Sequence, residues 1–463
     1  MRLNKDLVIL ALVLLLIKQS TLFRKALAYY RWSKLKVIEA VPCPPEFLRA
    51  KNAFLRNYLE GRERGSQMTL TVDGKVVFDI RAGRDESCLF DDGVVMVFSS
   101  TKVIESLVVA MLVDQGKLAY EDPIAKHWPE FGERFSSAVT VAQLMGHQAG
   151  LEQIHETITT PQAQEIFASP QKQEEFVFRS LRIDERIKRG ESHTRYHAVT
   201  RGIIVDLLCY KVDGRRGADF IQQEIVAKLD GPVDFSLGCP LQKQTNFVEC
   251  EAANTLLESA LEIVMHQTGI VKYLYYPDAL PTDEELETHY RDFFLPEEVK
   301  MTLSLINRNG PTYKSLILVN DHRPGTHYLA NSPEFRSLPL MSVTGISNSR
   351  SLAKIIAELA CGGGKLLSPE GMAKALAHDQ PVTCELFHRK LTFTNAGWSC
   401  DRLGEEWVGW GGSGGSVTVF SPRFNASFSY IPTRLEGRAY KPNGLRILKE
   451  ITKVLSNSPK AYL

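Results

Sequence analysis

The sequence predicts an α+β fold in which one antiparallel sheet is flanked by helices and a helical lobe is inserted into the chain. Three observations support this class. Two alternating apolar runs joined by Asp73-Gly74 lie near the start, glycine-punctuated strand-like segments lie between Gly404 and Pro432, and the region between them has mainly helical periodicity. Because the strand-rich regions lie at opposite ends of the chain, we expect both to contribute to a single sheet.

The composition is that of a folded globular protein. The chain has 463 residues, of which 44% are hydrophobic and 24% charged, and its formal net charge is +1. Such a balance produces no field that attracts nucleic acid, so no nucleic-acid partner is expected. The eight cysteines are scattered without the spacing of a zinc motif. We therefore expect neither a metal nor a cofactor.

Residues 1–40 are predicted to form an N-terminal hydrophobic leader. Leu7–Ile17 is an unbroken apolar run of 11 residues, and as a helix it would span about 16 Å, well short of the roughly 30 Å hydrocarbon core. That length suits a secretory signal, and Ala26-Leu27-Ala28 offers a cleavage site. Between Leu7 and Val41, however, six basic residues accompany a single acid. This charge balance favours an uncleaved signal anchor and membrane association, with a secreted or lumenal protein and a mitochondrial presequence as alternatives.

The rest of the chain, residues 41–463, is predicted to form one domain of two lobes. Prolines in Val41–Phe47 break any helix that continues from the leader. The predicted elements are a helix at 47–59, a hairpin at 68–80, strands between 404 and 432, and a helix near the C-terminus with apolar Leu445, Leu448, Ile451 and Leu455. We assign 41–145 and 340–463 to an α/β lobe and 146–339 to the inserted helical lobe.

Ser99 lies three residues before Lys102, where an apolar helix begins. The apolar face of this helix consists of Val103, Ile104, Leu107, Val108, Met111 and Leu112. Residues i and i+3 of a helix lie on one side, about 5–6 Å apart at Cβ, so the lysine amine can reach the serine hydroxyl. Burial would lower the pKa of the lysine and make it a base, and the helix N-terminus would favour a developing oxyanion. Taken alone, the short motif also fits a capped helix with a surface lysine.

The surroundings of this motif resemble a known family. "VFSSTK", "MLVDQGKLAYEDPIAKHWPEF" and "VTVAQLMGHQAGL" are similar to the penicillin-binding-protein-like serine hydrolases. These include class C β-lactamases, D-alanyl-D-alanine peptidases, carboxylesterases of the same fold and β-lactamase domain-containing proteins of animals. "VDGKVVFDIRAG" resembles the first hairpin of the family, "YHAVTRGIIVDLL" its second motif and "GWGGSGGSVTVF" its third. The resemblance extends from about Leu48 to Leu455 and implies a β-lactamase/transpeptidase-like fold.

The resemblance also implies a catalytic set. Ser99 corresponds to the acyl-forming nucleophile and Lys102 to its partner, while Tyr196 opens "YHA", which matches the Y-x-N motif of the family. Either Lys102 or Tyr196 would act as the base, and the sequence leaves this open. The backbone N–H groups of Ser99 and Ser413 would form the oxyanion hole, each worth about 3 kcal/mol. His197 is a candidate substrate-binding donor, with a structural role as its alternative.

The third motif, Trp410-Gly411-Gly412, departs most from the family pattern. β-Lactamases and peptidases usually place Lys or His first, and tryptophan cannot supply a cation that pairs with a substrate carboxylate. Esterases of this fold accept tryptophan here. We therefore expect these three residues to contact a neutral substrate, with the glycines allowing it to lie close to the backbone. Ala198 likewise stands where β-lactamases have an amide side chain.

The sequence thus predicts a serine hydrolase that acts on a small-molecule ester or amide through an acyl-enzyme at Ser99. The alternative from another class is a catalytically weak or inactive scaffold that assembles at a membrane as a homo-oligomer. Trp410 and the absence of Asn at position 198 favour that alternative, whereas the retained Ser99, Lys102 and Tyr196 favour the enzyme. The missing cation at Trp410 argues against true β-lactamase or peptidase action.

Overall fold

A computed structural model describes most of the chain after the leader. The described residues are 34–59, 63–84, 93–239, 246–252, 307, 310–320, 329–378, 381–387, 389–400, 406–435 and 442–457. Within these ranges no helix is both long and apolar enough to cross a membrane. The apolar run Leu7–Ile17 lies outside the described residues, so the membrane anchor and the resulting localisation stay predictions.

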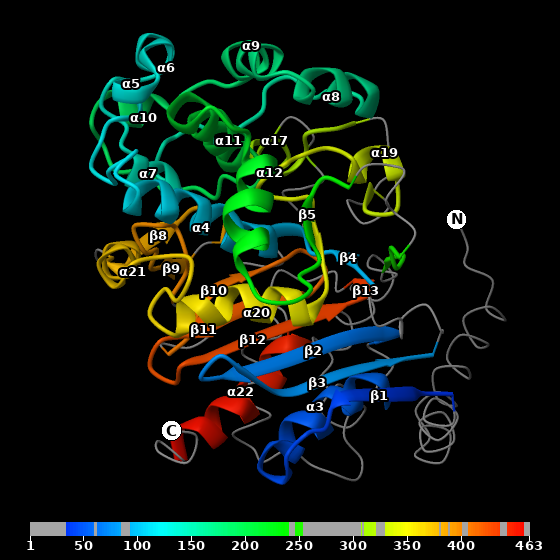
Figure 1. Cartoon of the computed structure of the whole chain (residues 1–463). Helices are drawn as coiled ribbons and strands as arrows, with labels where there is room; N and C mark the ends of the chain where they lie inside the picture. Colours follow the sequence, from blue (N-terminus) through cyan, green and yellow to red (C-terminus); the bar gives the residue numbers. More distant parts are fainter. Residues whose placement is uncertain are drawn as a thin grey trace, which may run out of the picture.

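A six-stranded antiparallel sheet brings the two ends of the chain together (Figure 1). Its order is β1-β3-β2-β12-β11-β10, so strands from the start of the fold pair directly with strands from its end. The strands are β1 (Lys36–Val41), β2 (Gly65–Val72), β3 (Lys75–Gly83), β10 (Val408–Gly411), β11 (Val417–Ser421) and β12 (Ala426–Pro432). The sheet starts earlier than the sequence suggested, because β1 lies almost wholly in the segment assigned to the leader.

The turn between β2 and β3 has the geometry that its sequence predicts. Asp73 and Gly74 both have positive φ, 48° and 72°, as a two-residue hairpin turn requires. The turn is tied to the neighbouring β11–β12 turn, because the backbone N–H of Asp73 donates to the carbonyl of Asn425 (2.8 Å) and the Asn425 amide donates to the Asp73 carboxylate (3.0 Å). The two hairpins therefore hold each other in register.

Helices cover both faces of this sheet. On one face α3 (Leu48–Leu59) packs beside α22 (Pro442–Asn457), and on the other lies α20 (Ser349–Ala360) (Figure 1). The apolar positions predicted for the C-terminal helix face inward: Leu448, Ile451 and Leu455 are buried against the sheet. Burial of these side chains is the main force that attaches α22 to the rest of the fold.

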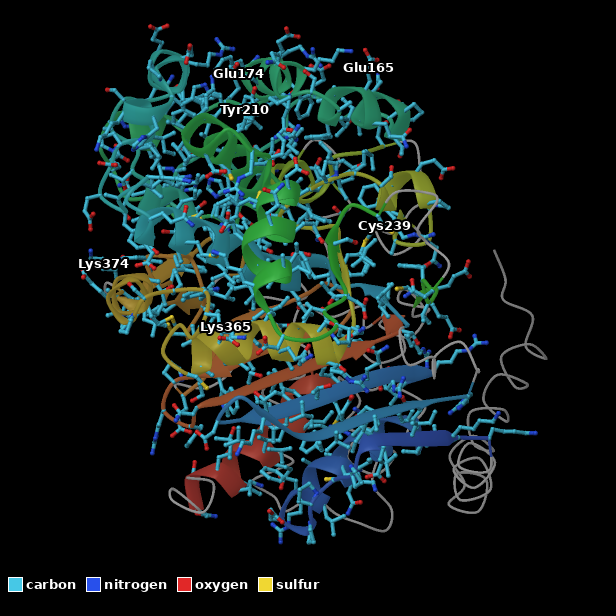
Figure 2. The ribbon with its side chains drawn as sticks, viewed as in Figure 1. Glu165, Glu174, Tyr210, Cys239, Lys365 and Lys374 are labelled. Carbon is cyan, nitrogen blue, oxygen red and sulfur yellow. The ribbon has the colours of Figure 1, made fainter. Side chains whose placement is uncertain are left out.

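The helical lobe lies on the α20 side of the sheet (Figure 1). Its helices are α5 (Ile124–His127), α6 (Pro129–Arg134), α7 (Val141–Met145), α8 (Thr160–Phe167), α9 (Pro170–Ser180), α10 (Glu185–Lys188), α11 (Thr200–Asp213), α12 (Gly217–Phe220), α17 (Pro311–Leu316) and α19 (Pro333–Arg336). Figure 2 shows Glu165 and Glu174 at the outer side of this lobe, on α8 and α9. Trp128, before α6, packs on Phe178 of α9. The lobe therefore begins before residue 146, where the sequence placed its boundary.

The apolar helix α4 (Thr101–Asp114) lies between this lobe and the sheet. It contacts α11 of the lobe, β10 of the sheet, and α21 (Pro369–Leu376). Around it are three small sheets, which are formed by β4 (Val95–Met96) with β7 (Gly345–Ser347) and β5 (Phe235–Leu237), by β8 (Val382–Cys384) with β9 (Arg389–Leu391), and by β13 (Arg434–Leu435) with β6 (Glu251–Ala252). The N-terminal end of α4 is therefore where the two lobes meet.

Candidate active site

Ser99 lies in a strained turn at the start of α4. It is the middle residue of a short 3-10 helix, Phe98–Ser100, that leads directly into α4. Phe98 has a φ of 48°, a left-handed conformation that is unfavourable for a large side chain and is found mainly where function requires it. The hydroxyl of Thr101 donates to the Phe98 carbonyl and closes the turn. As a result Ser99 is partly exposed, although its neighbours Phe98 and Ser100 are buried.

Lys102 is buried in the first turn of α4, with 1% of its side chain exposed. Its Nζ donates to the carbonyls of Ala198 (2.5 Å) and Ser342 (3.0 Å). Among the described residues it makes no hydrogen bond to Ser99, so the direct contact that the helical spacing allowed is not formed. Burial holds the pKa of Lys102 well below its ordinary value, and Arg201 adds to this effect while Glu105 opposes it. A neutral amine that donates both hydrogens to carbonyls still has a lone pair for a proton.

Tyr196 is the side chain that contacts the serine. Its Oη donates to Ser99 Oγ at 2.9 Å, and its ring lies 5.0 Å from Lys102 Nζ. The ring stacks on Trp410 at a centroid distance of 5.5 Å and also packs on Phe387. The structure thus brings all three groups of the predicted catalytic set together, with the tyrosine adjacent to the serine and the lysine behind it.

The third motif ends against the turn that contains Ser99. Trp410 and Gly411 lie on β10, opposite Thr418 and Val417 of β11. A Cβ on Gly412 would lie 2.1 Å from the Val97 carbonyl oxygen, so only glycine fits there. Immediately after it, the side chain of Ser413 is exposed.

Ser416 joins the same two segments through its hydroxyl. Ser416 Oγ donates to the Val97 carbonyl (2.9 Å) and lies 3.0 Å from Ser100 Oγ, and the Gly412 N–H donates to the Ser416 carbonyl (2.8 Å). These bonds attach the loop after β10 to the residues on both sides of Ser99. The sequence gives no signal for this role of Ser416, because a serine among glycines cannot be distinguished from a turn residue.

His197 is enclosed in the protein. Its Nε2 accepts from the Leu151 N–H (3.1 Å) and its Nδ1 donates to the Arg195 carbonyl (2.7 Å). Burial lowers the pKa of His197 to about 4, so the ring is neutral at physiological pH. Both ring nitrogens are used by the backbone, so neither is left to contact a substrate. His147 supports the same segment by accepting from the His197 N–H (3.1 Å) through its Nδ1.

A buried ion pair between Arg201 and Glu105 is connected to Lys102 through Ser342. Arg201 Nε donates to Glu105 Oε1 at 2.7 Å, and both side chains are fully buried. The second oxygen of Glu105 accepts from the Ser342 hydroxyl (2.6 Å), and the carbonyl of Ser342 accepts from Lys102. Glu105 is thus a buried, paired carboxylate. Arg201 was missed, although a single arginine in an apolar helix is a sign of buried pairing.

Comparison with known proteins gives a family match for the part of the chain that contains the three catalytic candidates. Residues 51–269 match the model of the family described as Beta-lactamase. A curated relative, the esterase/beta-lactamase LipL of Mycobacterium tuberculosis, is 28% identical over 248 residues, which cover 51% of this chain and 55% of the relative. The chain thus spans about half the length of this relative. The family match contains Ser99, Lys102 and Tyr196 and ends before the third motif. The resemblance predicted from the sequence motifs is confirmed.

Solved structures show that the same fold occurs in several proteins. A family VIII carboxylesterase has a TM-score of 0.68 at 20% identity and covers 90% of this chain and 100% of its own. EstA from Arthrobacter nitroguajacolicus has a TM-score of 0.67 at 21% identity, covering 91% and 100%. A penicillin-binding protein homolog from Caulobacter crescentus has a TM-score of 0.66 at 22% identity, covering 90% and 100%. The predicted α+β class with a β-lactamase/transpeptidase-like sheet is therefore confirmed.

Proposed function

Because this chain contains a Beta-lactamase family domain at residues 51–269, we propose that it is a serine hydrolase that forms an acyl-enzyme on Ser99. The observation that supports this most directly is the 2.9 Å hydrogen bond between Tyr196 and Ser99, with the buried amine of Lys102 behind the tyrosine ring. A hydroxyl in a strained turn, a second hydroxyl in contact with it and a lysine of lowered pKa are the parts that acyl transfer requires.

In the proposed mechanism a proton leaves Ser99 through Tyr196. As Ser99 Oγ attacks the substrate carbonyl, its proton passes to Tyr196 Oη, and the tyrosine passes its own hydroxyl proton to the neutral amine of Lys102. This step needs Tyr196 Oη to approach Lys102 Nζ when substrate binds, which is usual because catalytic hydrogen bonds tighten in the substrate complex. The backbone N–H groups of Ser99 and Ser413 stabilise the oxyanion. The proton then returns to the leaving alcohol or amine, and water releases the acyl group by the reverse route.

We propose neutral esters as the main substrates and amides as the second class. Trp410 occupies the position where peptidases and β-lactamases of this family have a cation, and it stacks on Tyr196 and on Phe393. An aromatic wall favours an apolar acyl or alcohol group over a carboxylate. The names of the esterase and carboxylesterase relatives agree with this class. We take Trp410, Gly411 and Gly412, without His197, as the substrate-binding residues.

A fluorophosphonate probe tests the proposal. It should label the intact protein, and Ser99→Ala should abolish the label, because the probe reacts only with an activated serine hydroxyl. Ser137→Ala, which removes an exposed hydroxyl between the segment of Ser99 and that of Tyr196, is the matched control and should leave labelling unchanged. A panel of p-nitrophenyl esters of rising chain length would then define the acyl preference. Absence of labelling in a folded protein would overturn the enzyme and leave the non-catalytic scaffold.

A further inference from the structure

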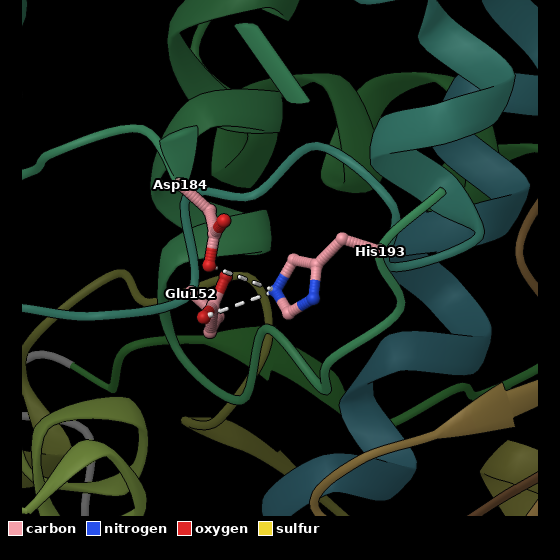
Figure 3. Close-up of side chains that lie close together, drawn as sticks. All are labelled: Glu152, Asp184 and His193. Carbon is pink, nitrogen blue, oxygen red and sulfur yellow. Dashed lines mark hydrogen bonds and ion pairs between the residues drawn. The ribbon is translucent and has the colours of Figure 1, made fainter. Parts of the chain in front are cut away.

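A second group of polar side chains lies in the helical lobe, before the segment that leads to Tyr196. Glu152, Asp184 and His193 point toward one another from three separate segments (Figure 3). Glu152 lies in the loop after α7, Asp184 caps the N-terminus of α10, and His193 precedes Tyr196 by three residues. The proposed hydrolase mechanism uses none of them, so their arrangement needs another explanation.

The separations in this group match those between ligands of one metal ion. His193 Nε2 lies 3.4 Å from Glu152 Oε1 and 3.7 Å from Asp184 Oδ2, and one ligand atom from each residue lies within 4.8 Å of the other two. Metal–ligand bonds of about 2.0–2.2 Å in tetrahedral geometry place ligand atoms roughly 3.4 Å apart. The same separations are long for hydrogen bonds, whose usual range ends near 3.2 Å.

Glu152 is a buried carboxylate that lacks a full set of partners. Only 1% of it is exposed, and in the part of the chain that the structure describes its Oε2 has no hydrogen-bond partner. Its Oε1 has two long contacts, to His193 (3.4 Å) and to the Gln153 amide (3.3 Å). Burying a carboxylate is costly unless it is paired, so the orphaned oxygen indicates a cation that completes the site.

The neighbours of the group resemble the outer shell of a metal site. His193 Nδ1, on the far side of the ring, lies 3.5 Å from Glu385 Oε1, which is too far for a hydrogen bond but places a carboxylate on the side where metal-bound histidines usually have one. Arg186 holds Asp184 by two contacts, Nε to Oδ1 at 3.0 Å and Nη2 to Oδ2 at 2.9 Å. Oδ2 keeps a second lone pair on the side of His193. The Asp184 carboxylate is thus oriented before any ion arrives.

We propose that Glu152, Asp184 and His193 bind one zinc ion, with a water molecule as the fourth ligand. One imidazole and two carboxylates form a ligand set that zinc accepts, and zinc binds nitrogen and oxygen ligands more tightly than manganese or ferrous iron does. Arg186 and Arg195 pair with the carboxylates of Asp184 and Glu385 but not with that of Glu152, so Glu152 supplies a negative charge that a divalent cation would offset. The ion would join three segments and hold the one that ends at Tyr196.

Zinc binding to the full chain tests this proposal. After treatment with a chelator and dialysis, the protein should bind one Zn²⁺ per chain in equilibrium dialysis, and Zn²⁺ should raise its melting temperature. His193→Gln and Glu152→Gln should each weaken the affinity by at least ~100-fold, and Glu385→Gln, which lies beside the imidazole and the two arginines but outside the proposed ligand set, by roughly 10-fold. The matched control is His155→Gln, because His155 is an exposed histidine three residues after Glu152.

The location of the ion is decided by diffraction at the zinc absorption edge on crystals of the unaltered protein. An anomalous peak bounded by Glu152, Asp184 and His193 supports the proposal even where a variant does not fold. Failure to bind Zn²⁺, binding that persists in both His193→Gln and Glu152→Gln, or an anomalous peak elsewhere would overturn it. The group would then be an ion-pair network centred on a protonated His193. None of these results depends on Ser99, so they are independent of the proposed hydrolase activity.

Discussion

The hydroxyl of Tyr196 contacts Ser99, whereas the amine of Lys102 is bound by two backbone carbonyls instead. This difference suggests separate roles for Tyr196 and Lys102. The two carbonyls that bind Lys102 Nζ hold the amine in place without a contact to Ser99, and burial lowers the pKa of Lys102. In the proposed mechanism the tyrosine therefore takes the proton of the serine, and the lysine takes the proton of the tyrosine.

Tyr196→Phe tests the first of these roles. The variant keeps the ring that stacks on Trp410 but removes the hydroxyl that bonds Ser99. We expect kcat for an activated ester to fall by about 10²–10⁴-fold, the usual effect of losing a proton-transfer group, with little change in melting temperature. Tyr210→Phe on α11 makes the same chemical change away from Ser99 and should be neutral (Figure 2). An equal effect of the two substitutions would contradict the assignment.

The lowered pKa of Lys102 has a measurable consequence for stability. The lysine is neutral in the folded state and protonated in the unfolded state at any pH between its folded pKa and 10.5, so the unfolded state binds one more proton there. The free energy of unfolding relative to Lys102→Met should therefore rise with pH by about 1.4 kcal/mol per pH unit in that window.

Urea unfolding of both proteins at pH 8 and pH 9.5 measures this slope. A difference that stays constant with pH would show that Lys102 is protonated in the folded protein. The ester hydrolysis rate provides an independent check, because it should rise with pH through the folded pKa of Lys102 and then level off below 10.5.

The catalytic candidates could be predicted from the sequence, but their contacts with one another could not. Ser99, Lys102 and Tyr196 occur in recognisable motifs, whereas the distance from Lys102 to Ser99 depends on where Ala198 and Ser342 offer their carbonyls. Glu152, Asp184 and His193 belong to no motif at all, since they meet only after three segments have folded. The contacts of Lys102 and the clustering of the three residues in the helical lobe both depend on tertiary packing, which cannot be derived from a single sequence.

Among the elements, the end of β10 depends on a glycine. Gly412→Ala should displace the loop after β10 from the turn that contains Ser99, because its Cβ would lie 2.1 Å from the Val97 carbonyl oxygen. We expect a loss of ester hydrolysis of about 10-fold or more, together with a lower melting temperature, since small misplacements of catalytic groups have large effects on rate.

Gly116→Ala separates this effect from backbone strain alone. Gly116 has a φ of 71° with no atom within 4 Å of an added Cβ, so the substitution should cost about 1 kcal/mol of stability without changing kcat. Wild-type kcat in Gly412→Ala would show that the contact between β10 and the turn is not needed.

The helices and strands also differ in how well the sequence predicts them. The β2–β3 hairpin is predictable, because the conformation of Asp73-Gly74 is a local property of those two residues. β1 is not, because a half-exposed edge strand next to a basic leader has little burial to mark it: its residues alternate between exposed and intermediate. The start of the helical lobe was misplaced for a related reason, since Trp128 joins that lobe through tertiary contacts with Phe178 and Lys211.

On the scale of the whole molecule, the two largest clusters of buried apolar side chains in the described part of the chain stabilise different regions of the fold. One lies between the sheet and the pair α3 and α22, and the other extends from α4 into the helical lobe. The general plan was readable from the sequence because both the strand patterns and the family motifs occur in order along the chain.

Ile451→Ala tests whether the first core stabilises the protein without forming the active site. Ile451 is fully buried on α22, so its truncation should lower the free energy of unfolding by about 2–5 kcal/mol in urea. Because α22 lies across the sheet from α20 and α4, kcat per folded molecule should stay at the wild-type value. Lys453→Ala, on the exposed side of the same helix, is the control and should change neither quantity. A loss of kcat in folded Ile451→Ala would show that the two cores are coupled.

The pairing of β2 with β12, and of Gly412 with the turn at Val97, has a consequence for biosynthesis. Ser99, Lys102 and Tyr196 leave the ribosome well before the strands from residue 408 onward. A nascent chain that ends before residue 408 therefore contains Ser99, Lys102 and Tyr196 but lacks β10 and Gly412, which pack against the turn that contains Ser99. On the proposed mechanism, acyl transfer therefore requires the strands from residue 408 onward to be synthesised and paired first.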